Sequence, residues 1–216
     1  MTAAVSTATM NRIYRRQRYI YDATRKYFLL GRDRLIVRLD AHAGAHVLEI
    51  GCGTGRNLIV AARRYPGARF YGIDVSTEML TSAYRSIEQA GLASRIRVAH
   101  ADATSFDAER LLGTAKFDRV FLSYTLSMIP RWQSAIDRAV LSIAPGGELH
   151  IVDFGGQAGL PSWFRSGLRR WIGLFHVMPR DTLEAMLKAQ AAPLGARFAI
   201  ERPYRDYAQY ARLKMP

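Results

Sequence analysis

The sequence predicts an α/β fold in which a parallel β-sheet is covered by helices on both faces. Three observations lead to this prediction. Short apolar runs that suit strands alternate with helix-compatible segments between residues 46 and 154. A glycine-rich loop follows the first of these strands, and acidic residues follow the next two. A chain of 216 residues fits one ordinary domain with a sizeable core.

We expect a flexible segment over residues 1–10 and a single domain over residues 11–216. Basic helical sequence covers residues 11–30, and a second helix is expected over residues 32–39, so residues 11–40 precede the first strand as a helical segment. The sequence contains no internal repeat and no low-complexity linker. Nothing in it therefore indicates a second domain.

The first strand is expected over residues 46–51 and leads into the glycine-rich loop. Gly51, Gly53 and Gly55 alternate with other residues, and helix-compatible sequence follows. Glycine permits positive φ and lacks a Cβ atom, so the amide groups of such a loop can meet a polar cofactor directly. A strand, a tight turn and a helix start therefore predict a cofactor-binding loop.

The spacing of the glycines argues against a dinucleotide. A dinucleotide fingerprint reads G-x-G-x-x-G, and its third glycine would fall at Arg56. Glu49 stands two residues before the first glycine, where a carboxylate would repel a pyrophosphate but attract a cation. S-adenosylmethionine carries a sulfonium and an ammonium and has no phosphate, so it suits this loop better.

The remaining elements continue the alternation of strands and helices. Strand 69–74 ends in Asp74, whose carboxylate oxygens could accept bonds from two ribose hydroxyls. Asp181 is a good N-cap for a helix near the C-terminus. Further strands are expected over residues 96–103, 117–124, 145–154 (after an initial turn), 196–201 and 207–213. Helices are expected over residues 56–65, 76–90 and 131–143.

The order and spacing of these motifs resemble the class I S-adenosylmethionine-dependent methyltransferases. The resemblance implies a Rossmann-like, seven-stranded, mostly parallel sheet with an antiparallel last strand. It also implies that Glu49 contacts the methionine end of the cofactor and Asp74 its ribose. The remaining implied cofactor residues are Asp102 and the Ala103 N–H at the adenine, Val75 and Met79 on its ring, and Arg32, Gly51, Cys52, Gly53, Asn57 and Ser123 around the loop.

Three segments, residues 21–36, 49–58 and 123–130, resemble the bacterial betaine-lipid N-methyltransferases. Those enzymes convert diacylglycerylhomoserine to its trimethyl form with three molecules of S-adenosylmethionine. For this chain the resemblance implies successive N-methylation of a lipid headgroup. Tyrosine rings tolerate a cation and their hydroxyls can orient an amine, so the candidate catalytic residues are Tyr21, Tyr27 and Tyr124, with Asp153 as a proton acceptor or, alternatively, a structural cap.

Two segments are expected to determine the acceptor. Residues 11–40 form a helical lid, and residues 155–178 form an insertion after the fifth strand. Arg32, Arg202 and Arg205 are candidates for binding the homoserine carboxylate, although Arg32 could instead hold the carboxylate of the cofactor. The insertion combines arginines with an apolar stripe, which suits either the headgroup boundary of a bilayer or the protein core. The stripe consists of Leu160, Phe164, Leu168, Trp171, Ile172 and Phe175.

Composition narrows the partners. Lys and Arg outnumber Asp and Glu by 31 to 18, a net charge of +13, which favours an anionic membrane surface or a nucleic acid. No apolar run approaches the ~20 residues of a membrane helix, and no secretory signal is apparent. We expect a cytoplasmic protein that associates peripherally with the inner face of the membrane. Cys52 is the single cysteine and is expected to pack, and the five histidines indicate no metal site.

Other functions remain as alternatives. Phosphatidylethanolamine and quinone methyltransferases differ mainly in the acceptor. An RNA methyltransferase would explain the charge, but Ser123-Tyr-Thr-Leu stands where an Asn/Asp-Pro-Pro-Tyr motif would be expected, so we do not expect a nucleic acid partner. A noncatalytic membrane-binding protein would not need Glu49, Asp74 and Asp102 together.

Overall fold

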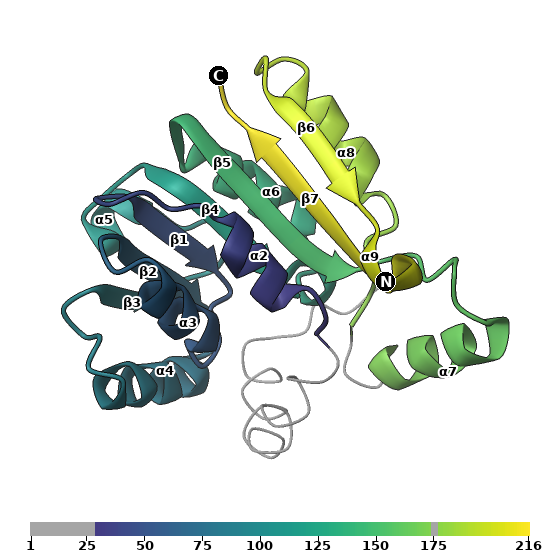
Figure 1. The fold of residues 1–216 in the computed structure, drawn as a ribbon, viewed down its shortest axis with the longest axis horizontal. Coiled ribbons are helices and arrows are strands. Elements are labelled where there is room, and N and C mark those ends of the chain that lie inside the picture. Colours follow the sequence, from purple (N-terminus) through teal and green to yellow (C-terminus); the bar gives the residue numbers. More distant parts are fainter. Residues whose placement is uncertain (1–28, 174–176) are drawn as a thin grey trace.

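The computed structural model describes residues 29–173 and 177–216, and its strands form one sheet in the order β3-β2-β1-β4-β5-β7-β6 (Figure 1). Every neighbouring pair is parallel except those that β7 makes with β5 and β6. The predicted Rossmann-like class I methyltransferase fold is confirmed. The strands are β1 His46–Ile50, β2 Arg69–Asp74, β3 Ile96–His100, β4 Phe117–Ser123, β5 Ile143–Phe154, β6 Arg197–Glu201 and β7 Ala208–Lys214.

Helices cover both faces of the sheet and bury a separate apolar cluster on each. On one face the cluster includes residues from α2, α3, α4 and α7, and on the other from α5, α6 and α8. The helices are α2 Arg32–Arg38, α3 Arg56–Arg64, α4 Thr77–Gln89, α5 Ala108–Leu112, η1 Leu126–Met128, α6 Trp132–Leu141, α7 Ser162–Gly173, α8 Leu183–Ala191 and the short α9 Pro203–Asp206.

The centre of the sheet explains where a ligand can bind. Strand β1 lies between β2 and β4, and its side chains alternate between the two clusters, with Val47 in one and Leu48 in the other. Ile50 pairs with both Ile73 and Leu122, so the carboxyl ends of the three strands lie level at one edge. In an open parallel sheet, ligands bind outside this edge, where the strand order reverses.

Two helices of the structure differ from the prediction. The helix expected to begin at Asp181 begins at Leu183, and Thr182 occupies its N-cap without a side-chain hydrogen bond. Asp181 instead lies 3.6 Å from the guanidinium of Arg169. The helix α5 was not predicted, because its five residues are too few to show a helical period, although Asp107 caps it through a bond from the Arg110 N–H. The expected helix over residues 11–30 lies outside the described residues.

No helix among residues 29–173 and 177–216 is long and apolar enough to cross a membrane.

Candidate cofactor site

The loop between β1 and α3 has the conformation that its glycines predict. Gly51, Gly53 and Gly55 all have positive φ, at 77°, 54° and 78°. The amides of Gly51 and Cys52 both donate to the carbonyl of Ile73, at 2.8 and 2.9 Å, which ties the loop to the end of β2. A Cβ atom at Gly51 would lie 2.3 Å from Cγ2 of Thr125. This loop therefore requires glycine for both its backbone conformation and its close packing.

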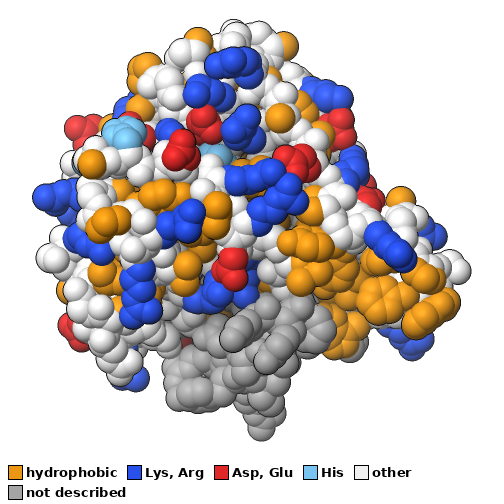
Figure 2. Space-filling view, viewed as in Figure 1, with side chains coloured by type: hydrophobic (Ala, Val, Ile, Leu, Met, Phe, Trp, Pro, Cys, Tyr) orange, Lys and Arg blue, Asp and Glu red, His pale blue; other side chains and the backbone are white. Residues whose placement is uncertain are grey.

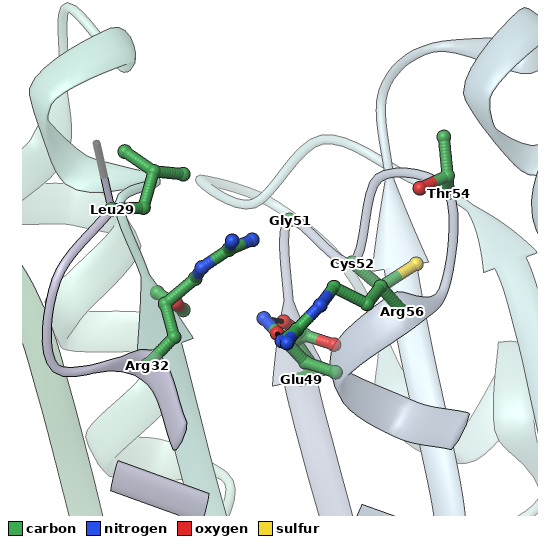
Figure 3. Close-up of a pocket in the computed structure, with 9 residues that line it drawn as sticks. Leu29, Arg32, Glu49, Gly51, Cys52, Thr54 and Arg56 are labelled. Atoms are coloured by element: carbon green, nitrogen blue, oxygen red, sulfur yellow. Dashed lines mark hydrogen bonds between the residues drawn. The ribbon is translucent and has the colours of Figure 1, made fainter. Parts of the chain in front are cut away.

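A pocket of about 280 Å³ opens in front of this loop (Figure 3). Its walls come from the residues at the start of α2, the end of β1, the glycine loop, the start of α3 and the end of β4. Arg32 and Arg56 enter the view from opposite sides, with Glu49 between them. The lining residues are Leu29, Arg32, Glu49, Gly51, Cys52, Thr54, Arg56, Asn57 and Ser123.

A buried carboxylate lies at the base of the pocket. Glu49 is 1% exposed, and its Oε1 accepts a hydrogen bond from Nδ2 of Asn57 at 2.7 Å. The guanidinium of Arg56 donates to Oδ1 of Asn57 at 3.3 Å and to Oδ1 of Asp33 on α2 at 3.0 Å. This chain of contacts links α2 to α3 and fixes the amide that orients Glu49. The arrangement presents negative charge beside the glycine loop, which suits a cationic ligand.

Asp74 connects the glycine loop to the start of α4. Its Oδ2 accepts a bond from the Gly53 N–H at 2.8 Å, and its Oδ1 accepts one from the Ser76 N–H at 2.9 Å. The carboxylate therefore fixes the glycine loop and the start of α4 at the same time. Each carboxylate oxygen can accept more than one hydrogen bond, so both remain able to bind a hydroxyl.

The residues expected around adenine cluster farther along the same edge. Asp74 pairs with His100, which brings the end of β3 beside the end of β2. Oδ1 of Asp102 accepts bonds from the amide and hydroxyl of Thr104, both at 2.8 Å. Met79 is 3% exposed at the start of α4. Neither these residues nor Val75 and Ala103 line the pocket, so the adenine contacts stay a prediction.

Residues 47–147 match a protein-family model described as a methyltransferase domain. The match and the sheet topology agree with a class I methyltransferase fold. The chain is 33% identical over 117 residues to trans-aconitate 2-methyltransferase of Paracidovorax citrulli, a match that spans 54% of this chain and 42% of that protein. It is 30% identical over 152 residues to O-methyltransferase resE of Aspergillus sclerotiorum, which spans 69% and 54% of the two chains. The chain thus spans about half the length of these curated relatives.

Solved structures support the same fold. The [4+2]-cyclase SpnF superposes with a TM-score of 0.70 at 17% identity, over 97% of this chain and 96% of that one. Phosphoethanolamine N-methyltransferase 2 of Haemonchus contortus, in complex with S-adenosylmethionine, gives a TM-score of 0.67 at 18% identity, over 86% and 52% of the two chains. At such identities the likeness shows the fold alone. The family match and the fold together confirm S-adenosylmethionine as the predicted cofactor.

The residues of the methyltransferase domain fit that cofactor. Glu49 and Asp74 place carboxylates on two sides of the glycine loop, which suits a ligand with positive charges and ribose hydroxyls. The hydroxyl of Ser123 is buried at the pocket wall and has no hydrogen-bond partner within the part of the chain that the structure describes. A ligand in the pocket can satisfy this hydroxyl. Burial and the charges of Asp74 and Glu49 raise the pKa of the Cys52 thiol well above its ordinary value, which agrees with a packing role.

Tyr124 was expected at the rim of the pocket, but it is not among the residues that line it. It is 2% exposed, and its hydroxyl donates to the carbonyl of Leu30 at 2.7 Å. Its ring packs edge-on against Phe154, with 4.7 Å between centroids. Burial raises the pKa of the phenol well above its ordinary value, so it stays neutral. The structure gives Tyr124 the role of holding the segment before α2 against the sheet, in place of a position at the acceptor rim.

Asp153 is likewise part of the interior. It is fully buried, its Oδ2 accepts a bond from the Ser127 N–H at 3.0 Å, and its Oδ1 accepts one from the Phe154 N–H at 2.8 Å. Burial raises the pKa of this carboxyl. Asp153 does not line the pocket, and its bonds fix η1 to the end of β5. These bonds fit the structural cap, and the proton-acceptor role stays a prediction. Tyr21 and Tyr27 lie outside the described residues.

Among the three candidate arginines, Arg32 is the one that lines the methyltransferase pocket. Arg202 instead forms ion pairs with Glu184 at 2.8 Å and Asp206 at 3.2 Å. Arg205 belongs to the α9 turn. Sequence reasoning missed Leu29, Thr54 and Arg56 as lining residues. For Thr54 and Arg56 the signal was present, because both lie inside or directly after the glycine-rich loop.

Proposed function

We propose that this chain is an S-adenosylmethionine-dependent N-methyltransferase that methylates the amine of diacylglycerylhomoserine in successive steps, giving the trimethylated betaine lipid. The reaction would take place at the inner, cytoplasmic face of a membrane. The assignment of the methyl donor is supported by the pocket that Glu49 lines, by the glycine loop that Asp74 fixes and by the family match. The lipid acceptor rests on one observation, the exposed aromatic and cationic surface of α7.

This surface consists of large apolar side chains that a folded chain normally buries. Trp163 is 75% exposed, Phe164 40% and Trp171 37%, and the exposed apolar patch on α7 is visible in Figure 2. Leu168 and Ile172, from the same predicted stripe, pack against the core instead. The stripe therefore divides into a core side and an exposed side. Contiguous exposed apolar surface of this kind marks an interaction site.

Arginines beside the aromatic residues favour a lipid surface as the partner. Arg165 and Arg170 are exposed on the same helix. Tryptophan at a membrane interface places an amphipathic ring at headgroup depth, and arginines there attract anionic lipid by about 1 kcal/mol each. After α7 the chain returns to the carboxyl edge of the sheet, since the Met178 amide donates to the Ser127 carbonyl at 2.8 Å. Ser127 belongs to η1, which follows β4. A lipid bound at α7 would thus lie near the edge that carries the pocket.

For methyl transfer, the protein mainly has to align the amine with the methyl group and to stabilise the charges of the two substrates. S-adenosylmethionine supplies a methyl group on a positively charged sulfur that a neutral amine can attack in line. Glu49, held by Asn57, places negative charge beside the pocket, and Asp74 fixes the loop that shapes it. Arg32 enters the pocket from α2, where it can bind a carboxylate of the donor or the acceptor. The acceptor ammonium must lose its proton before each transfer.

A second candidate is O-methylation of a small carboxylic acid. The matched relatives named trans-aconitate 2-methyltransferase favour it, and Arg32 at the pocket would suit an acceptor with carboxylates. Phosphatidylethanolamine and quinone acceptors remain further alternatives of the same reaction class. The four acceptors differ in mass and solubility, so one assay can separate them.

The test supplies methyl-labelled S-adenosylmethionine and each acceptor in turn. Diacylglycerylhomoserine and phosphatidylethanolamine are given in mixed micelles, trans-aconitate in buffer, and a quinol in detergent, with RNA as a further arm. The proposal expects mono-, di- and trimethylated products of diacylglycerylhomoserine by mass spectrometry. Label in trans-aconitate and none in lipid would replace it with the second candidate. An Asp74→Ala protein serves as the inactive control.

A further inference from the structure

A second charged site lies on the outer part of the sheet. In Figure 1, α2 lies in front of β4 and β5 and α8 lies behind β6. Arg38 of α2 reaches over Tyr210 of β7, and no described helix lies in front of β6. Residues of β6 alternate accordingly. Arg197, Ala199 and Glu201 face outward, whereas Phe198 and Ile200 pack on the cluster beneath α8. This face is therefore solvent-exposed within the described structure.

Three cations gather on this face. Arg197 of β6 stands directly opposite Lys214 of β7, and Ala199 stands opposite Arg212. Residues directly opposite in an antiparallel pair point to the same side, and like charges placed this way repel. The small Ala199 leaves room between them. Two hollows of about 260 and 390 Å³ share Ala199 and Arg212 as walls.

One carboxylate forms ion pairs with two of these cations. Glu148 of β5 lies 3.1 Å from the ammonium of Lys214 and 3.9 Å from the guanidinium of Arg212. Bonds to His150 and Lys214 hold the pKa of Glu148 at about 2, so it is ionised at neutral pH. Arg197 has no hydrogen bond or ion pair in the part of the chain that the structure describes. Three cations and one carboxylate thus leave about two positive charges unbalanced.

The charges beside these cations are paired, because α2 and β6 form ion pairs there. Arg34 and Arg38 of α2 bind the two carboxylate oxygens of Glu201, at 2.7 and 2.6 Å. Arg38 also lies 5.0 Å above the ring of Tyr210, whose hydroxyl is 2.7 Å from Nδ1 of the fully buried His150. These contacts fix the hollow that Arg38, Glu201 and Tyr210 line. Arg197, and Arg212 with its single long contact of 3.9 Å to Glu148, keep guanidinium donors available to a ligand.

We propose that Arg197, Arg212 and Lys214 form a binding site for a phosphate monoester. A phosphate monoester carries close to two negative charges at pH 7, which matches the local excess of positive charge. Guanidinium groups donate two parallel bonds to phosphate oxygens, and a lysine ammonium adds a point charge. Glu148 and Phe154 lie six positions apart along β5, which corresponds to about 20 Å between Glu148 and the carboxyl edge of the sheet. The site is therefore separate from the cofactor pocket and does not depend on the proposed methyl acceptor.

Calorimetric titration with inorganic phosphate tests the site. We expect saturable binding by the wild-type chain, and binding at least tenfold weaker in the double variant Arg197→Ala, Arg212→Ala. The matched control is Arg63→Ala, Arg85→Ala, which removes two exposed arginines from α3 and α4 and should bind phosphate as the wild type does. The variant Arg197→Lys, Arg212→Lys keeps the charge and removes the bidentate geometry, so its affinity should lie between the two.

Vesicle flotation distinguishes a lipid headgroup from a soluble molecule as the source of the phosphate group. Vesicles of phosphatidylcholine with phosphatidic acid present a phosphate monoester, whereas phosphatidylglycerol vesicles present a diester with one charge. Binding to the first vesicles alone, lost in the alanine double variant, would assign the site to a lipid headgroup. Phosphate binding in solution without a difference between vesicles would assign it to a soluble phosphate monoester.

Three results would overturn the proposal. These are no saturable phosphate binding by the wild type, equal binding by the alanine double variant, and a change of oligomeric state in that variant with phosphate binding unchanged. The last would identify the face as an interface between copies of the chain. An unaltered thermal transition and S-adenosylmethionine affinity show that the variants fold. Should the alanine variant not fold, the lysine variant decides alone, and affinity equal to wild type then counts against the site. Methyl transfer is not measured, so failure of the proposed function leaves this test intact.

Discussion

The inner strands of the sheet and its outer edge present different kinds of surface to a ligand. Around β1, β2 and β4 the cofactor site depends on the main chain of the glycine loop, which has three glycines at positive φ. The carboxylate of Asp74 fixes this loop and the start of α4. The outer region, α7, β6 and β7, lies beyond the residues that match the methyltransferase model and presents side chains on its surface. Backbone geometry tolerates few substitutions, whereas surface side chains can vary freely. The family match and the glycine loop tie the cofactor to the inner strands, whereas we propose that the acceptor and partners depend on the outer region.

The strongest test of the inner region is Asp74→Ala. This change removes the acceptor for the Gly53 and Ser76 amides as well as the expected ribose contact. Loss of a charged hydrogen-bonding group costs roughly 1.5–3 kcal/mol, so S-adenosylmethionine affinity should fall about 10- to 150-fold. Isothermal titration calorimetry measures it. Glu88→Ala, an exposed carboxylate near the end of α4, is the comparison. An affinity for Asp74→Ala equal to wild type would show that this edge does not hold the cofactor.

In the outer region the largest effect is expected from Trp163→Ala with Phe164→Ala. The two ring centroids lie 5.7 Å apart, and the residues are 75% and 40% exposed and belong to neither buried cluster, so they add little to the folded core. Burying a large apolar side chain contributes about 1.5–3 kcal/mol, and the double variant should bind anionic vesicles at least tenfold more weakly in sedimentation assays. Leu141→Ala, another exposed apolar residue, is the control. Equal vesicle binding by all three proteins would remove α7 from the membrane contact.

A smaller effect within the pocket should follow from Glu49→Gln. The amide keeps an oxygen for Asn57 but removes the negative charge next to the cofactor. An opposite charge at a few ångströms is worth about 1 kcal/mol or more, so S-adenosylmethionine affinity should fall roughly fivefold. S-adenosylhomocysteine lacks the sulfonium charge and should lose less. If both ligands lost equal affinity, Glu49 would not respond to the sulfonium.

The two regions also differ in how far the sequence predicts them. The glycine loop, Glu49 and Asp74 were predictable, because the chemistry requires particular residues at fixed spacing within one strand, turn and helix. The buried positions of Tyr124 and Asp153 were not, since they depend on contacts with Leu30 and Ser127 far away in the sequence. The same holds for the cation cluster around Arg212, which arises only when β5, β6 and β7 pair.

The pH dependence of unfolding tests the ion pairs that Glu148 forms at the outer site. Glu148 has a pKa of about 2 in the folded chain against an ordinary value of 4.5, chiefly through its bond to His150. A lowered pKa stabilises the fold above the ordinary value, and this contribution is lost as pH falls from about 4.5 to about 2. Glu148→Gln should therefore be less stable than wild type at pH 6 and converge with it near pH 2 in urea unfolding. Glu88→Gln on α4 is the control, and a constant difference at all pH values would contradict the ion pairing.

Cys52→Ala should have the smallest effect and separates packing from catalysis in the inner region. The side chain is 6% exposed, and its pKa is raised by burial and by Asp74 and Glu49, so at neutral pH it is a thiol and a poor nucleophile. Methyl transfer to the acceptor should stay within about twofold of wild type, with at most about 1 kcal/mol lost in unfolding. Loss of turnover in a folded Cys52→Ala protein would give the thiol a chemical role.

A larger side chain at this position provides the opposite test. A Cβ atom at Gly72 would lie 2.9 Å from Sγ of Cys52, so the thiol already fills the space above β2. Cys52→Leu should therefore displace the glycine loop and weaken S-adenosylmethionine binding, whereas Cys52→Ala leaves it unchanged. Affinity that falls with the size of the side chain, independent of its nucleophilicity, would show that position 52 serves the cofactor by shape alone.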